Sequence, residues 1–313
     1  PLLCIPTLVA LEADHVVSIR DIAHSQLLAL HEKLPTQIHQ PAVKGVFISH
    51  TFQVNAFGTS TVYALDKEKN EYSLFGRLYT ACLRPVRSQR NMFLRALTNQ
   101  FSDNGTVLTS NNLVTKPLKT VEYLSFLAQF VTSLPFDVED EPLFIIYHIN
   151  RNVTLTLGPT IQALKKAFTS LGVAAVDVMQ DDADVAGADI SPLLKLDHED
   201  ERLREVLAQC CVGFAIQLML RIKFHLKDAY GLDNEKCQTY QPGGATKATD
   251  QSLTRSQHSP SRLELPTIQD LQAEHPLQLS WNMFVHTCRA AQEDQNQLDF
   301  DVYEDKGRVK KKK

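Results

Sequence analysis

The stretch "EDEPLFIIYHIN", residues 139–150, sets three carboxylates in front of an apolar run that carries a tyrosine and a histidine. Acids near an imidazole are the groups that general acid–base catalysis uses. The order of residues favours a structural role instead, because Asp140 or Glu141 offers an N-cap oxygen and Pro142 suits the first helical position. Acids are also stabilised at the positive end of a helix. We therefore predict a helix that begins here, with structural carboxylates and with His148 as a half-buried packing residue.

Other catalytic patterns fail on spacing. The eleven histidines are scattered, and the sequence contains neither HExxH, nor a glycine-rich phosphate loop, nor GxSxG. His24 and His31 lie seven residues apart, on one face of a predicted helix, but no third metal ligand accompanies them. We expect a chain that is not an enzyme and that holds neither a metal nor a cofactor.

An arginine block offers a different chemistry. No acid occurs between Glu71 and Asp103, and five arginines fall there: Arg77, Arg84, Arg87, Arg90 and Arg95. Three of them are three residues apart, next to a helix predicted to begin near Ser88. Clustered guanidiniums at a helix start can hold a phosphate through charge and exposed N–H groups, which predicts contact with DNA or with a protein partner. The alternative is a solvated face, or ion pairs with acids of neighbouring repeats.

A second basic patch lies in "LRIKFHLKD", where positive side chains recur one helical turn apart. Its basic residues are Arg221, Lys223, His225 and Lys227. We consider contact with a phosphate or a protein through Arg221, Lys223 and Lys227. The alternative is that their stems cover apolar surface at the edge of a buried helix.

The C-terminal tail is the third basic candidate, and it follows the acidic stretch "DQNQLDFDVYED". Its basic residues are Lys306, Arg308, Lys310, Lys311, Lys312 and Lys313. Such a run serves as a nuclear address or a mobile DNA tether. It equally fits a solubilising tail or the product of a truncated gene model.

The overall composition fits a soluble folded protein, with 43% hydrophobic and 22% charged residues. The formal net charge of −4 shows no global basic excess, so any nucleic-acid binding must come from a local patch. The six cysteines form no CxxC pair, which favours a reducing compartment. No run reaches the roughly 18 apolar residues of a membrane helix, so we expect no membrane partner. The chain opens at Pro1 in an apolar run, so we expect it to be a piece of a longer protein.

Helical patterns dominate the chain. Apolar residues recur at spacings of three and four over 19–34 and 119–134. We expect the helix that begins at 140 to end near 158–159, a further helix over 161–171, and the longest helix over about 200–230. No strand is expected. Residues 173–199 form an acidic loop, and short helices are expected at 266–275 and 277–292.

These patterns predict an all-α protein, an α-solenoid of HEAT-type helical hairpins. We divide it into a solenoid over 1–238, a disordered linker over 239–263, short terminal helices over 264–298 and a charged disordered tail over 299–313.

The first 35 residues are the most informative local stretch. "LLCIPTLVALEADHVVSIRDIAHSQLLALHEKLP" reads as a short helix, a tight turn at Asp14 and a second helix. This order is similar to a HEAT repeat, a helical hairpin that recurs every 40 to 47 residues or so. Asp14 is expected to cap the second helix and Arg20 to reach an acid of the adjoining repeat. Any other two-helix hairpin is the alternative.

Four separated blocks also resemble one family. "CIPTLVALEAD", "RSQRNMFLRALTNQF", "DEPLFIIYHIN" and "FHLKDAYGLDNEKCQTYQP" occur in this order. Together they resemble the C-terminal HEAT-repeat region of the Nipped-B family of cohesin-loading factors, also called adherins or delangins. The resemblance covers about residues 1–242.

The resemblance implies a hook-shaped HEAT solenoid in the nucleus that loads the cohesin ring onto chromatin for sister chromatid cohesion. Such loaders contact double-stranded DNA, the SMC heads and the kleisin, and they stimulate ATP hydrolysis by cohesin. They bind a TPR-type partner through an N-terminal region that this chain lacks, so we expect no such binding here. The competing interpretation is a HEAT scaffold or adaptor that binds only proteins.

Overall fold

The structure, a computed structural model, describes residues 2–66, 68–102, 117–170, 201–243, 252–253, 255, 262–265, 281–285, 287–290, 292 and 294. The expected acidic loop at 173–199, the helix at 266–275 and the charged tail lie outside these residues. So do most of the expected linker and part of the helix at 277–292. The chain divides into two units. Unit 1 comprises residues 1–100, 122–148 and 222–263, and unit 2 comprises 101–121, 149–221 and 264–313.

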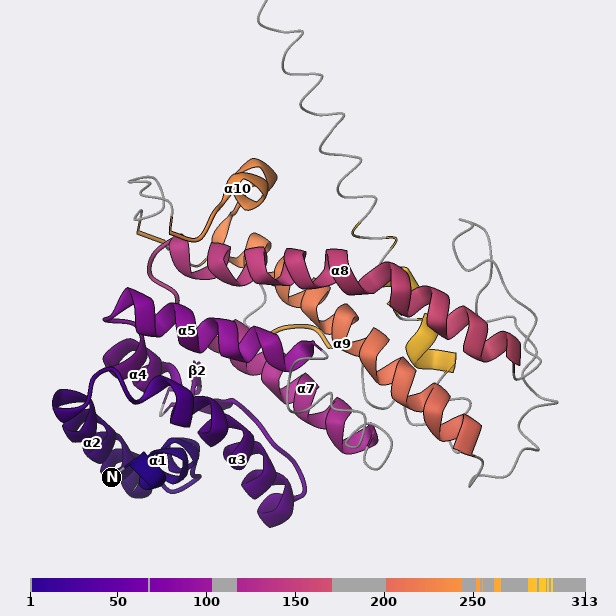
Figure 1. Cartoon of the computed structure of the whole chain (residues 1–313). Coiled ribbons are helices and arrows are strands. Elements are labelled where there is room, and N and C mark those ends of the chain that lie inside the picture. The colour runs from indigo at the N-terminus through magenta and orange to yellow at the C-terminus, as the bar shows by residue number, and fades with distance from the viewer. Residues whose placement is uncertain are drawn as a thin grey trace, which may run out of the picture. The chain divides into compact units, whose positions relative to one another are not determined.

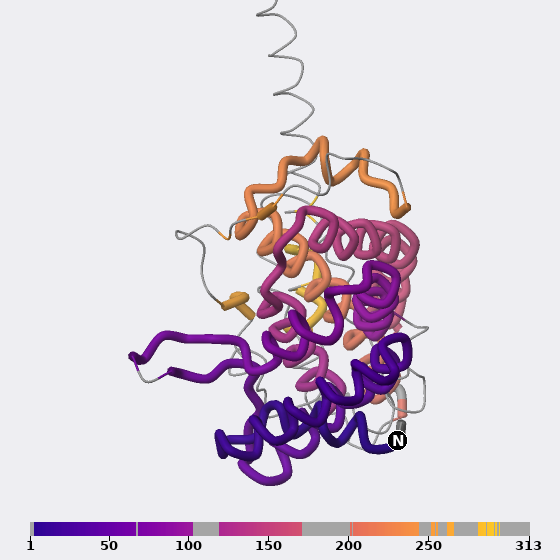
Figure 2. Tube along the Cα trace, turned by 90° about the vertical axis from the view of Figure 1, so that its left-hand side faces the viewer, coloured from indigo at the N-terminus to yellow at the C-terminus, as the bar shows by residue number. Residues whose placement is uncertain are grey.

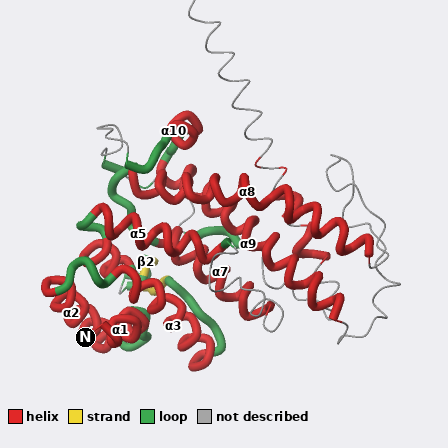
Figure 3. The backbone as a smooth tube through the Cα atoms, viewed as in Figure 1, coloured by secondary structure: helices red, strands yellow, loops and turns green. Residues whose placement is uncertain are grey.

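Helices make up most of the described chain, which confirms the all-α prediction (Figure 3). The N-terminal helices are α1 (Ile5–Leu11), α2 (Val17–Lys33), α3 (His39–Phe57), α4 (Gly76–Leu78) and α5 (Arg87–Thr98). They are followed by α7 (Pro117–Ser133), α8 (Asp140–Ser170), α9 (Glu201–Tyr230) and α10 (Asn234–Thr239). A π-helical turn (Tyr79–Leu83) follows α4, and 3-10 turns occupy Leu2–Cys4 and Asn99–Phe101.

The expectation of no strands is wrong at one place. The strands β1 (Tyr63–Leu65) and β2 (Glu71–Ser73) pair antiparallel and extend from the helices as a hairpin (Figure 2). The turn between them is closed by Asp66, whose Oδ1 accepts the backbone N–H groups of Glu68 and Asn70, both at 2.8 Å. Strands of three residues are too short to produce a recognisable alternation, so the sequence pattern missed them.

The N-terminal helical pair forms as predicted in unit 1, where α1 also packs closely on α3 (Figure 1). The expected cap by Asp14 is wrong, because the N-cap residue of α2 is Val16 and no side chain caps the helix. Asp14 instead accepts the backbone N–H of Val16 at 2.8 Å, directly before α2. Arg20 was expected to reach an acid of the adjoining repeat. Its guanidinium instead lies 6.0 Å from the ring centre of Tyr72, on the hairpin. Arg20 is only 9% exposed, so little water surrounds its guanidinium, and the face of the tyrosine ring partly replaces that water.

The expected break at residues 158–159 is also wrong, because α8 continues through Pro159 to Ser170. A proline inside a helix lacks the N–H that would bind the carbonyl four residues earlier, here Leu155. Leu155, Gly158 and Pro159 are all exposed, so water can satisfy that carbonyl and the helix persists.

The helix α9 has the predicted bounds and end, but it is not the longest helix, because α8 continues past residue 158 and has 31 residues against 30 for α9. Gly231 adopts the left-handed conformation, with φ of 60°, and Leu232 donates its N–H to the carbonyl of Lys227 at 2.9 Å, as in a Schellman cap. By length and composition alone, residues 203–230 of α9 could cross a membrane. However, 78% of their most apolar window is buried inside the protein, as in a core helix.

Each unit has its own aromatic core. In unit 1, Phe130 of α7 packs against Phe75 and Phe93, with ring centres 4.9 and 6.4 Å away. In unit 2, Phe168 of α8 packs against Trp281 and Phe284 at 5.2 and 5.3 Å. All five phenylalanines and the tryptophan are less than 5% exposed. These rings fix the helices that carry the charged groups described next.

Candidate functional site

The first turn of α8 carries two buried acids, Asp140 and Glu141, which are 1% and 0% exposed. Arg87 of α5 binds Asp140 with two donors, at 2.7 and 3.1 Å. Arg90, one turn later on α5, donates to the same carboxylate, and the hydroxyl of Tyr240 donates to it at 2.8 Å. We call these residues, together with Tyr79, the α8 ion cluster. It joins α5, α8 and the chain after α10.

Glu141 completes the cluster on its other side. Its Oε1 accepts the hydroxyl of Tyr79 at 2.8 Å, and its Oε2 accepts the backbone N–H groups of Asp137 and Val138 at 2.7 and 3.1 Å. A guanidinium nitrogen of Arg90 lies 3.7 Å from Oε1. Burial, together with the charge of Glu141, raises the pKa of Tyr79, so its hydroxyl stays a donor. These contacts close the turn in front of α8.

The geometry gives these carboxylates a structural task, as the sequence predicted, although in a different way. Neither acid caps an amide within its own helix. Asp140 instead binds two guanidiniums and a phenol, and Glu141 binds the two amides that precede the helix. Because both carboxylates are enclosed and hydrogen-bonded, they are not placed to exchange a proton with a substrate.

The rest of the arginine block also lies beside acids. Arg77 binds Asp21 at 2.7 Å and lies 3.5 Å from the buried Glu12, while Arg84 lies 3.6 Å from Asp137. Arg90 is 5% exposed and is therefore withdrawn from a phosphate backbone. These contacts agree with the alternative in which the arginines form ion pairs with acids of the chain. Arg95 is exposed on α5, and the contact of the block with DNA or cohesin stays a prediction.

The second basic patch divides into separate contacts. Arg221 donates to the carbonyl of Glu264 at 3.1 Å, and Lys227 donates to the side chain of Asn234. Lys223 and His225 are 8% and 9% exposed. Burial lowers the pKa of His225 to about 4, so this ring is neutral near pH 7. These positions resemble the alternative of stems that cover apolar surface, and their contact with a partner stays a prediction.

Sequence reasoning missed two polar contacts. His24 Nδ1 lies 2.7 Å from Oε1 of Glu12, which is completely buried, and desolvation raises the pKa of this carboxyl. Lys236 of α10 binds Glu139 at 2.8 Å. The partners are separated by 12 and 97 residues, so no local pattern indicates them. Within the described ranges, no group of three or more histidines, cysteines or acids is arranged to hold a metal ion.

Comparisons with known proteins agree with the resemblance seen in the sequence. The family described as Sister chromatid cohesion C-terminus, the C-terminal part of Nipped-B, matches residues 1–152. Nipped-B-like proteins of Mus musculus and Homo sapiens are 24% and 25% identical, and the aligned region covers 82% of this chain. The Nipped-B protein of Drosophila melanogaster is 23% identical over 82% of this chain. The chain spans 10% of the length of the two mammalian relatives and 12% of the length of the fly protein.

Proposed function

This chain belongs to the Nipped-B family, and from that membership we propose that it is the C-terminal part of a loader that places cohesin on chromatin for sister chromatid cohesion. One observation carries the proposal: residues 1–152 match a family whose description names both sister chromatid cohesion and the C-terminus. The proposed location is nuclear chromatin, and the proposed partners are the SMC heads and the kleisin of cohesin and double-stranded DNA.

We assign the chain a non-catalytic role within the loader. It would contact cohesin and DNA and stimulate ATP hydrolysis by the SMC heads, with no chemistry of its own. Stacked helices suit this role, because a rigid helical scaffold presents long surfaces to several partners. The enclosed carboxylates of α8 agree with a scaffold, since their oxygens are occupied by arginine, tyrosine and backbone donors.

A second candidate is a part of the loader that contacts only proteins. It is favoured by the ion pairs of the arginine block, which reduce the charge available to a phosphate backbone. Arg84, Arg87 and Arg90 all lie beside acids of the segment 137–141. The two candidates share the same family membership and differ only in the DNA contact.

The decisive experiment uses the purified chain with purified cohesin and a linear duplex. We expect the immobilised chain to retain cohesin, to bind the duplex weakly, and to raise the rate of ATP hydrolysis by cohesin when DNA is present. Retention of cohesin without any DNA binding would support the protein-only candidate. A folded chain that neither retains cohesin nor changes its ATPase rate would contradict both candidates.

A further inference from the structure

The β1–β2 hairpin has two different faces. Tyr63 pairs with Ser73 and Leu65 pairs with Glu71, so these four side chains share one face. Tyr72, paired with Ala64, lies on the opposite face. The face with Tyr63 and Glu71 therefore combines an aromatic ring with a carboxylate, held in register by the strands.

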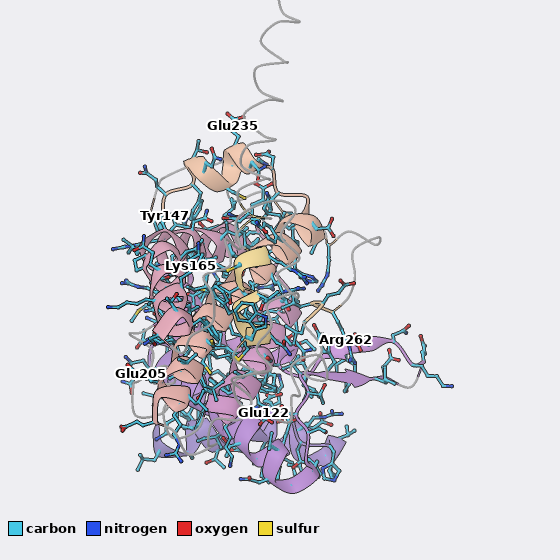
Figure 4. All side chains as sticks on the ribbon, turned by 90° about the vertical axis from the view of Figure 1, so that its right-hand side faces the viewer. Glu122, Tyr147, Lys165, Glu205, Glu235 and Arg262 are labelled. Atoms are coloured by element: carbon cyan, nitrogen blue, oxygen red, sulfur yellow. The ribbon has the colours of Figure 1, made fainter. Side chains whose placement is uncertain are left out.

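Arg262 occupies this face. Its guanidinium carbon lies 5.0 Å from the ring centre of Tyr63, and its Nε donates to Oε1 of Glu71 at 2.7 Å. A second guanidinium nitrogen contacts the same carboxylate oxygen. Figure 4 shows Arg262 beside the hairpin. A ring face and a carboxylate together recognise both properties of a guanidinium, its flat surface and its charged donors.

The two sides of this contact are anchored unequally. Tyr63 and Glu71 stand on the paired strands β1 and β2, and with Arg262 in place Tyr63 is 8% exposed and the Glu71 side chain is 20% exposed. The Arg262 side chain is 55% exposed and lies on top of them, as a bound ligand would. The other hairpin face repeats only the ring contact, because the guanidinium of Arg20 lies over the ring of Tyr72.

Arg262 lies near the end of the segment 252–263, and we call its described residues, 252–253, 255 and 262–263, the strap. At its start, Ser252 forms an isolated β-bridge with Val138, and Leu253 donates its N–H to the carbonyl of Asp137 at 2.7 Å. Arg255 then contacts His225 at 3.0 Å, and Leu263 is buried at the end. At these described positions the strap contacts other residues of unit 1.

We propose that Tyr63 and Glu71 form an exchangeable arginine-binding site, filled within the chain by Arg262 and available to an arginine in an extended segment of a partner protein when Arg262 leaves it. The fold supplies the site, since both groups stand on paired strands. Arg262 is a replaceable occupant, since a half-exposed ion pair contributes little to the stability of the fold and can open without unfolding it.

Exchange within the chain is tested with trypsin, which cleaves after arginine. Glu71→Gln removes the charge that holds Arg262 and keeps the size of the side chain. We expect cleavage after Arg262 to become about three- to tenfold faster, the size of effect that one charge-assisted contact produces. Glu68→Gln, on the turn of the same hairpin, is the matched control and should leave the rate unchanged. Equal rates in both variants would overturn the proposal.

Binding from outside is tested with a labelled peptide of residues 252–263 and the full chain. Arg262→Ala should bind the peptide more tightly than the wild-type chain does, because its site is vacated. A peptide with alanine in place of Arg262 should bind at least about threefold more weakly, and so should the Arg262→Ala/Glu71→Gln chain. Circular dichroism confirms that each variant is folded. Equal binding of the two peptides, or no binding by the Arg262→Ala chain, would overturn the proposal.

Discussion

Arg90 of α5 donates its guanidinium to the carboxylate of Asp140 of α8, and their side chains are only 7% and 1% exposed. Each charge alone would be costly to bury, because the protein interior solvates ions poorly. Together, and with the hydroxyl of Tyr240 on the same carboxylate, they form a satisfied pair. A buried pair of this kind fixes which helices meet more than it adds net stability.

Replacing Arg90 with methionine should therefore destabilise the chain. The stem is kept, but Asp140 and Glu141 lose a buried donor, and the expected cost is about 3 kcal/mol, the low end for a broken buried pair because Arg87 remains on Asp140. The free energy of unfolding from urea titration measures it. Arg95→Met, on the exposed side of the same helix, is the control and should leave the urea midpoint almost unchanged. A midpoint for Arg90→Met that matches this control would contradict the structural role.

The contact between α1 and α3 depends on Gly45. A Cβ at this position would lie 2.5 Å from Cβ of Val9 and 2.9 Å from the carbonyl oxygen of Pro6. Both obstacles are stiff, so Gly45→Ala should cost about 1 to 3 kcal/mol through overpacking. Gly158→Ala in α8 is the control, because a Cβ there meets no atom within 4 Å outside its chain neighbours. The helical preference of alanine over glycine, about 0.5 to 1 kcal/mol, is opposed by Pro159, whose ring crowds a Cβ on the preceding residue. Thermal melting should therefore show a marked drop for Gly45→Ala and little change for Gly158→Ala. A melting temperature of Gly45→Ala at or above that of the wild type would contradict the close packing.

The sequence allowed the helices to be predicted wherever their signals are local. The start of α8 at "EDEP" and the end of α9 at Gly231 depend on neighbouring residues, and both were predicted. The continuation of α8 through Pro159 depends on the solvent exposure of the helical turn that contains this proline. The local sequence does not reveal that exposure, so it could not be predicted. The arginine block was recognised as a cluster, but its acids come from distant segments. Arg90 and Asp140 are 50 residues apart, so the choice between phosphate contact and ion pair required the fold.

Two buried histidines should make stability fall in acid. Burial lowers the pKa of His50 and of His225 to about 4, below the ordinary value of 6.5. The unfolded chain takes up these protons below about pH 6.5, whereas the folded chain takes them up only near pH 4. Stability from this source is therefore complete above pH 6.5 and declines as the pH falls toward 4. Urea titrations at several pH values measure the decline.

The number of protons linked to unfolding separates the two rings. His50 lies between Tyr123 and Phe126, with ring centres 5.4 and 5.2 Å away. His50→Gln should reduce the slope of stability against pH by up to about one proton, and His50→Gln/His225→Gln by up to about two. An unchanged slope in the double variant would show that neither ring is held neutral by the fold.

DNA binding by the chain, where it occurs, should depend on exposed arginines and not on the α8 ion cluster. Each phosphate contact contributes just under one unit to the slope of log affinity against log salt. Arg95→Glu should therefore flatten this slope by about one unit while the chain keeps its melting temperature. Arg151→Glu, an exposed arginine of α8 outside the block, is the control for a general change of net charge. The triple change of Arg84, Arg87 and Arg90 to glutamate should instead lower the melting temperature sharply, because it leaves Asp140 and Glu141 without their cations. If the triple variant stays folded and its slope of log affinity against log salt is flattened, these three arginines contact DNA and the prediction is wrong.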